Sequence, residues 1–201
     1  MRRREVDPAA VVEGAIQGTA TALKAARLAG LLAYDELLLL GMRRFHGPWR
    51  TRVAKVFTCA GDARSWAIAG VALVATGRQT GAELALRVGV GSTLGALAAQ
   101  VLKRTLNRAR PTRAIAGFQA LAEDPDAFSF PSGHTAAAVA VAVALAGEPW
   151  GAGPLALLLA TGIALSRVYL GAHYPFDVLV GGVVGSGAGA VARAAVSEML
   201  D

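Results

Sequence analysis

Residues 128–147 read FSFPSGHTAAAVAVAVALAG, and this stretch predicts both the start of a helix and the chemistry of its first turn. Ser132 stands where an N-cap residue belongs, directly before an apolar run of helix length. The first N–H groups of a helix lack intrahelical partners and can bind an anion. Gly133 lets the backbone come close to that anion, and the Ser132 hydroxyl can donate to it. His134 can lend a proton near neutral pH. In the alternative interpretation, Pro-Ser-Gly is an ordinary turn and His134 a solvated loop residue.

A second stretch, VLKRTLNRARP at residues 101–111, supplies two cations. Lys103 and Arg110 are seven residues apart, so on one helix they lie on nearly the same face and can point at one anion. Arginine offers a planar fork for phosphate and lysine a compact charge. Pro111 ends the helix close to these charges. The alternative is a basic cluster that only anchors a membrane helix at the headgroups.

A third stretch, SRVYLGAHYPFDVLVGG at residues 166–182, places His173 four residues before Asp177. Pro175 suits the first turn of a new helix. At this spacing a carboxylate can hydrogen-bond one imidazole nitrogen and leave the other free as nucleophile or base. Arg167 adds a third fixed cation. A histidine and an aspartate at helical spacing also form ordinary caps or surface hydrogen bonds, and that alternative holds for the pair taken alone.

Taken together, the three stretches resemble the type 2 phosphatidic acid phosphatase superfamily of lipid phosphatases. The family pattern is Lys, six residues and Arg-Pro; then Pro-Ser-Gly-His; then Ser-Arg, five residues, His, three residues and Asp. Every position of the pattern is matched here, between residues 103 and 177: Lys103, Arg110, Pro111, Pro131 to His134, Ser166, Arg167, His173 and Asp177.

The resemblance implies a metal-free and cofactor-free phosphatase that acts through a phosphohistidine. His173 would attack phosphorus, oriented by Asp177. His134 would protonate the departing alkoxide and then serve as base for the hydrolytic water. The phosphate oxygens would be held by Lys103, Arg110, Ser132, Gly133 and Arg167.

Composition indicates a bilayer protein on independent grounds. Of the 201 residues, 54% are hydrophobic and 17% charged, and the mean hydropathy is +0.47. Five uncharged stretches extend into polar flanks that can lie at headgroup depth. We expect an all-α, polytopic membrane helix bundle with five to six transmembrane helices, and alternating helix directions would bring the three motifs to one membrane face. The stretches are Ser65–Gly77, Val88–Leu102, Thr135–Gly147, Trp150–Leu165 and Val178–Ala192.

The N-terminal part differs in character. Residues 9–42 are apolar but interrupted by charges, which favours an amphipathic interfacial helix, with one poor span or a hairpin as alternatives. The following RRFHGPWRTRVAKVF, residues 43–57, mixes basic and aromatic side chains as anionic lipid headgroups require. We therefore assign the net charge of +6 to lipid and phosphate attraction and not to nucleic acid. We expect one domain, residues 1–201, with an interfacial region at 1–60 and a core at 61–201.

The expected partners are the bilayer and a membrane lipid phosphate: polyprenyl phosphate or diphosphate, phosphatidylglycerol phosphate, phosphatidic acid or a phosphorylated glycolipid. The sequence indicates no oligomeric state.

No convincing signal peptide follows MRRREVDP, and the single Cys59 excludes an intramolecular disulfide. We expect a multi-pass inner-membrane protein with its site on the extracytoplasmic face; a five-span chain would favour the cytoplasmic face. Alternatives are a lipid phosphotransferase, a vanadate-dependent haloperoxidase and a non-catalytic lipid-binding protein.

Overall fold

All the elements of the computed structural model are helices, and it describes residues 29–123, 126–148 and 151–200. The chain divides into two compact units, residues 1–38 and 39–201. In the part described, residues 29–42 are helical, while most of the predicted interfacial segment at 9–42 lies outside the described residues. The elements that follow are η1 (Arg43–Phe45), α2 (Pro48–Ala60), α3 (Ala63–Ala75), α4 (Gln79–Leu106), α5 (Pro111–Ala114), α6 (Gly133–Ala144), α7 (Ala152–Tyr169) and α8 (Pro175–Leu200).

The all-α prediction is confirmed, and the predicted apolar stretches coincide with α3, α4, α6, α7 and α8. Helices α4, α7 and α8 are long and apolar enough to cross a membrane. Their 28, 18 and 26 residues rise about 42, 27 and 39 Å at ~1.5 Å per residue, against a hydrocarbon core of about 30 Å. Helices α3 and α6 have only 13 and 12 residues. The chain is thus a multi-pass membrane protein, and its five to six spans stay a prediction.

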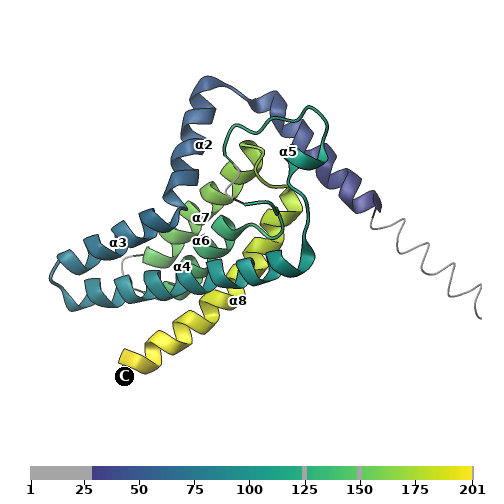
Figure 1. Ribbon diagram of the computed structural model, residues 1–201. Coiled ribbons are helices and arrows are strands. Elements are labelled where there is room, and N and C mark those ends of the chain that lie inside the picture. The colour runs from purple at the N-terminus through teal and green to yellow at the C-terminus, as the bar shows by residue number, and fades with distance from the viewer. Residues whose placement is uncertain (1–28, 124–125, 149–150, 201) are drawn as a thin grey trace, which may run out of the picture. The chain divides into compact units, whose positions relative to one another are not determined.

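Helix α6 lies against α4, α7 and α8 (Figure 1). Its side chains are small, and Ala136, Ala140 and Ala144 are fully buried. Large apolar side chains point outward instead: Leu158, Leu179 and Val183 are among the most exposed. This distribution suits lipid, where the exterior is apolar and helices associate through small residues at close approach.

Glycines of α4 and α8 bring these helices against the backbone of α6. A Cβ atom at Gly95 would lie 2.5 Å from the carbonyl oxygen of Ala136. One at Gly189 would lie 2.5 Å from the carbonyl oxygen of Ala140 and 2.7 Å from Cβ of Val143. Backbone cannot yield as a flexible side chain can, so α6 is held between helices that admit no Cβ there.

Two alanine substitutions on α8 test this packing. Gly189→Ala places a methyl group against α6 and should reduce stability by about 1–3 kcal/mol. Gly187→Ala meets no atom within 4 Å and should leave stability unchanged or slightly raised, since alanine is the better helix former. Thermal unfolding midpoints of both variants in one detergent decide the matter, and equal midpoints would contradict the packing argument.

Candidate active site

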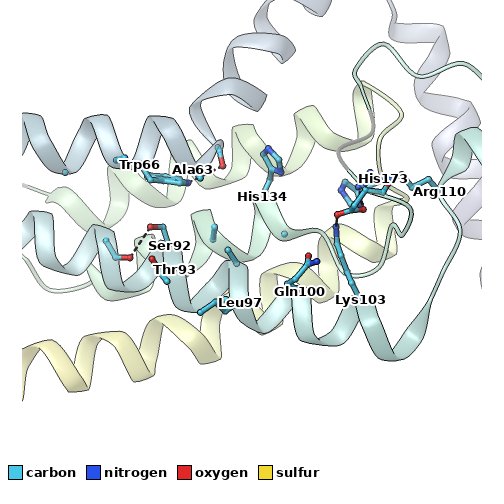
Figure 2. A pocket seen from close by; sticks show the side chains of 18 residues that line it. Ala63, Trp66, Ser92, Thr93, Leu97, Gln100, Lys103, Arg110, His134 and His173 are labelled. Atoms are coloured by element: carbon cyan, nitrogen blue, oxygen red, sulfur yellow. Dashed lines mark hydrogen bonds and ion pairs between the residues drawn. The ribbon is translucent and has the colours of Figure 1, made fainter.

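Helix ends bring the three sequence motifs together. Lys103 lies in the last turn of α4, Gly133 and His134 in the first turn of α6, Arg167 in the last turn of α7, and His173 just before α8. A cavity of about 590 Å³ is lined by site residues from each of the three motifs. Figure 2 shows Lys103, Arg110 and His173 gathered at one end of the cavity, with His134 between them and Trp66.

The cavity changes character along its length. Its polar end holds the two histidines, Lys103 and Arg110. Away from them, α3 and α4 line it with small or apolar side chains, as Figure 2 shows for Trp66 and Leu97. A molecule with a phosphate at one end and a hydrocarbon chain at the other matches both parts. The small or apolar lining residues on α3 and α4 are Ala63, Trp66, Ala67, Gly70, Gly89, Ser92, Thr93, Ala96 and Leu97.

Lys103 and Arg110 come together by a different route from the one predicted. Helix α4 ends at Leu106 because Asn107 adopts a left-handed conformation, with φ of 45°. Arg110 is then the N-cap of α5, and Pro111 begins that short helix instead of ending α4. The prediction of two cations on one helical face was wrong, although both line the cavity.

Asp126 bridges the two cations. Its carboxylate accepts from Lys103 Nζ at 2.6 Å and from Arg110 Nη2 at 2.7 Å. Arg110 also donates to the backbone oxygens of Asp126 and Ala172, both at 2.8 Å. Burial alone would raise the pKa of Asp126, but its hydrogen bonds with the two cations outweigh this and hold it below its usual value. No motif indicated Asp126, which lies in the polar connection between α5 and α6.

His173 and Asp177 are adjacent, as their spacing predicts. The distance from His173 Nδ1 to Asp177 Oδ2 is 3.6 Å, longer than a hydrogen bond. Asp177 accepts instead from Arg108 Nη1 at 2.7 Å and from the Tyr174 N–H at 2.9 Å. Arg108 is not one of the motif positions, and its guanidinium also stacks over the Tyr174 ring at 4.0 Å. Catalytic hydrogen bonds such as the one expected between His173 and Asp177 are often long in unliganded sites and shorten when substrate binds.

The His173 ring is fully enclosed, with 1% of the residue exposed. Burial, helped by the neighbouring charges of Arg167 and Arg110 and opposed by Asp177, lowers its pKa to about 4. The imidazole is therefore neutral at pH 7. A neutral ring keeps the lone pair that a nucleophile needs.

Ser132 joins the start of α6 to the start of α8. Its N–H donates to the backbone oxygen of Asp177 at 3.0 Å, and its hydroxyl accepts from Thr135 Oγ1 at 3.0 Å. The residue occupies the predicted N-cap position in an extended conformation, but its side chain makes no cap hydrogen bond. Gly133, the first residue of α6, lines the cavity.

Arg167 is buried, is not among the residues that line the cavity, and is held by a residue of α2. Its Nη1 donates to Thr58 Oγ1 at 3.1 Å, and Thr58 Oγ1 lies 3.0 Å from Ser166 Oγ.

His134 also has a partner outside the motifs: its Nε2 lies 2.8 Å from Oδ1 of Asp62, in the turn between α2 and α3. Among the described residues, no group of three or more His, Cys, Asp or Glu side chains is arranged to hold a metal ion.

Comparison with known proteins places the same residues within a family. Residues 84–199 match the PAP2 superfamily. A decaprenylphosphoryl-5-phosphoribose phosphatase of Mycobacterium tuberculosis strain H37Rv is 37% identical over 106 residues, 53% of this chain and 58% of the relative. An undecaprenyl-diphosphatase of Sulfolobus acidocaldarius is 31% identical over 111 residues, 54% of this chain and 52% of the relative. The chain thus spans between half and two thirds of the length of these relatives.

A solved structure shares the fold. The PAP2 type phosphatidylglycerolphosphate phosphatase of Bacillus subtilis superposes with a TM-score of 0.65 at 24% identity, covering 84% of this chain and 87% of that one. At this identity the likeness concerns the fold alone. It extends the comparison beyond the residues matched in sequence.

The ionisation of His173 can be measured directly. In the phosphate-free protein it should titrate near pH 4, well below 6.5, because the enclosed site disfavours the imidazolium. The chain has three histidines, so ¹⁵N-histidine spectra can be assigned with one substitution variant for each. A His173 titration at or above pH 6.5 would contradict the enclosed, neutral ring described here.

Proposed function

The chain belongs to the PAP2 superfamily, and from this premise we propose that it hydrolyses a phosphoester or diphosphate bond of a membrane lipid. The observation that carries the proposal is the cavity itself. It joins two histidines and the cations Lys103 and Arg110 at one end to a groove of mainly small or apolar residues along α3 and α4. An amphiphile with a terminal phosphate fits both ends, with its headgroup among the charges and its chain between the helices.

His173 is the proposed nucleophile. Its Nδ1 faces Asp177, so Nε2 is the nitrogen that attacks phosphorus as the bond to the leaving oxygen breaks. His134 donates a proton to that oxygen. In the second step His134 takes a proton from the water that attacks the phosphohistidine, and His173 leaves as the neutral ring. Asp177 stabilises the charge that develops on His173.

The phosphate oxygens are held by fixed charges and N–H groups. The cations are Lys103, Arg110 and Arg167. The start of α6 adds the Ser132 hydroxyl and the Gly133 N–H. Such preorganised charges account for much of the catalysis in phosphoryl transfer. The chemistry proposed here uses no metal ion and no cofactor.

We propose a polyprenyl phosphate or diphosphate as the substrate class. Two curated relatives carry names that state a polyprenyl-linked phosphate or diphosphate as substrate. The small or apolar residues that line the groove suit a hydrocarbon chain. Phosphatidic acid and phosphatidylglycerol phosphate carry a terminal phosphate on a glycerolipid with two acyl chains. They are the comparison substrates.

Phosphate release from a lipid panel tests the activity. The detergent-purified protein should release phosphate from polyprenyl monophosphate or diphosphate faster than from phosphatidic acid or phosphatidylglycerol phosphate, and excess EDTA should not stop it. His173→Ala should lower the rate by on the order of 10³-fold or more, since the nucleophile is gone. His46→Ala is the matched control, because this histidine contacts Tyr169 instead of the cavity.

Three results would overturn parts of this assignment. Full activity of His173→Ala would remove His173 as nucleophile. Loss of activity in EDTA with recovery in Mg²⁺ would indicate a metal-dependent mechanism. Transfer of the phosphate to an acceptor other than water would identify a phosphotransferase.

We also propose that the site faces the extracytoplasmic side of the inner membrane. A six-span chain with its basic first residues in the cytoplasm would place it there. Residues near opposite ends of the bundle can report the orientation. Gln119 is exposed in the connection on the site side, and Glu198 is exposed at the far end of α8.

Single cysteines at these two positions, made in a Cys59→Ser background, should differ in how they are labelled in intact cells. A membrane-impermeant maleimide should label Gln119→Cys and spare Glu198→Cys until the cells are permeabilised. The reverse pattern would place the site in the cytoplasm. Retained phosphatase activity of both variants is the control for correct folding.

A further inference from the structure

The turn between α2 and α3 reaches the catalytic histidine of α6. Asp62 in this turn lies with Oδ1 at 2.8 Å from His134 Nε2. Asp62 precedes residues 84–199, which match the family, and no motif includes it. His134 Nδ1 has no hydrogen-bond partner among the residues that the structure describes, so the two ring nitrogens have different surroundings.

The Asp62 carboxylate is not used to hold the turn together. Asp62 is the N-cap of α3, a position where an aspartate side chain commonly accepts from the helix, but it makes no side-chain cap hydrogen bond. Its backbone oxygen accepts the N–H groups of Ser65 and Trp66, at 3.0 and 3.2 Å. Ser65 Oγ donates to the Cys59 oxygen at 2.6 Å, and Trp66 Nε1 donates to the Gly61 oxygen at 3.2 Å. The turn is therefore closed by other groups, and the carboxylate is directed at His134.

The turn is also packed tightly on the histidine. A Cβ atom at Gly61 would lie 2.9 Å from Ile163 Cγ2 and 3.1 Å from His134 Cδ2. Only a residue without a side chain lets the turn approach α6 and α7 this closely without shifting a neighbour. The backbone of the turn is thus held close to both helices at Gly61, and the half-exposed Asp62 side chain reaches His134 from there.

We propose that Asp62 is the positioning residue of His134. The carboxylate accepts a hydrogen bond from Nε2–H, fixes the ring orientation, and leaves Nδ1, protonated before the reaction, as the nitrogen that serves the leaving group. During phosphoryl transfer the Nδ1–H bond breaks and its proton goes to the leaving oxygen as the P–O bond breaks. His134 is then neutral, with Nε2–H still donated to Asp62, and Nδ1 can accept the proton of the hydrolytic water.

This inference rests on the proposed phosphatase function and predicts a dependence on the leaving group. A lipid alkoxide needs a proton to depart, whereas p-nitrophenolate leaves with little help. Asp62→Asn keeps the size of the side chain and a good N-cap residue but removes the charge. It should slow the single-turnover release of the lipid alcohol by about 10- to 100-fold, within the range of general acid catalysis, and that of p-nitrophenol by less than about threefold.

Three further variants separate positioning from stability. Asp62→Glu should recover part of the lost rate, because it restores a carboxylate. Ser65→Ala loosens the same turn without touching His134, and should keep the wild-type rate on both substrates. Asp62→Asn added to His134→Ala should cause no further loss, because the two residues act as one unit.

The outcomes distinguish this inference from the proposed function. If the wild-type protein releases no phosphate from any lipid in the panel, the proposed function fails. If the wild-type protein is active but Asp62→Asn slows release from both substrates equally, the positioning role fails. It also fails if the rate loss of Asp62→Asn multiplies with the rate loss of His134→Ala in the double variant. The pairing itself is read without activity from ¹⁵N spectra of His134. Asp62→Asn should change the protonation pattern of the two ring nitrogens while Ser65→Ala should not, and an unchanged pattern in Asp62→Asn would overturn the inference.

Discussion

The close contact between the backbone of α6 and the helices beside it is the constraint from which the site follows. In lipid, burial of apolar side chains gives helices little reason to associate, so backbone approach and interhelical packing must hold them. Gly95 of α4 and Gly189 of α8 admit α6 at distances that a methyl group would prevent. The first turn of α6 thereby lines the same cavity as Lys103, and the Ser132 N–H ties its start to the backbone oxygen of Asp177.

Charge is tolerated inside this bundle because it is paired. A buried ion is costly unless an opposite charge and further hydrogen bonds compensate it. Arg110 is fully buried and has Asp126 and the Ala172 oxygen as partners, while Asp177 is fully buried and has Arg108 and the Tyr174 N–H. The same pairs that permit burial also orient the groups that face the cavity. Packing and electrostatics therefore act on the same few helix ends.

The sequence predicted the helices and the meeting of the motifs better than the contacts between them. Uncharged runs have a clear physical cause in lipid, and α6 begins at Gly133 as its N-cap signal indicated. The common helix expected for Lys103 and Arg110 was wrong, since periodicity does not reveal that Asn107 turns left-handed. Asp62, Arg108 and Asp126 were not found, because they come from turns and loops, where no repeat places a side chain. Only the three-dimensional fold joins them to the motifs.

For the proposed phosphatase, the Asp126 bridge makes phosphate binding an exchange reaction. Its carboxylate already makes with Lys103 and Arg110 the contacts that phosphate oxygens would make. A phosphate that enters between the two cations must displace it, so the apparent affinity is the intrinsic affinity reduced by the free energy of the carboxylate contacts. The same term favours departure of the phosphate, because the carboxylate returns to its partners. In the proposed phosphatase, Lys103 and Arg110 would therefore always have an anionic partner, and product release would be favoured at the expense of tight binding.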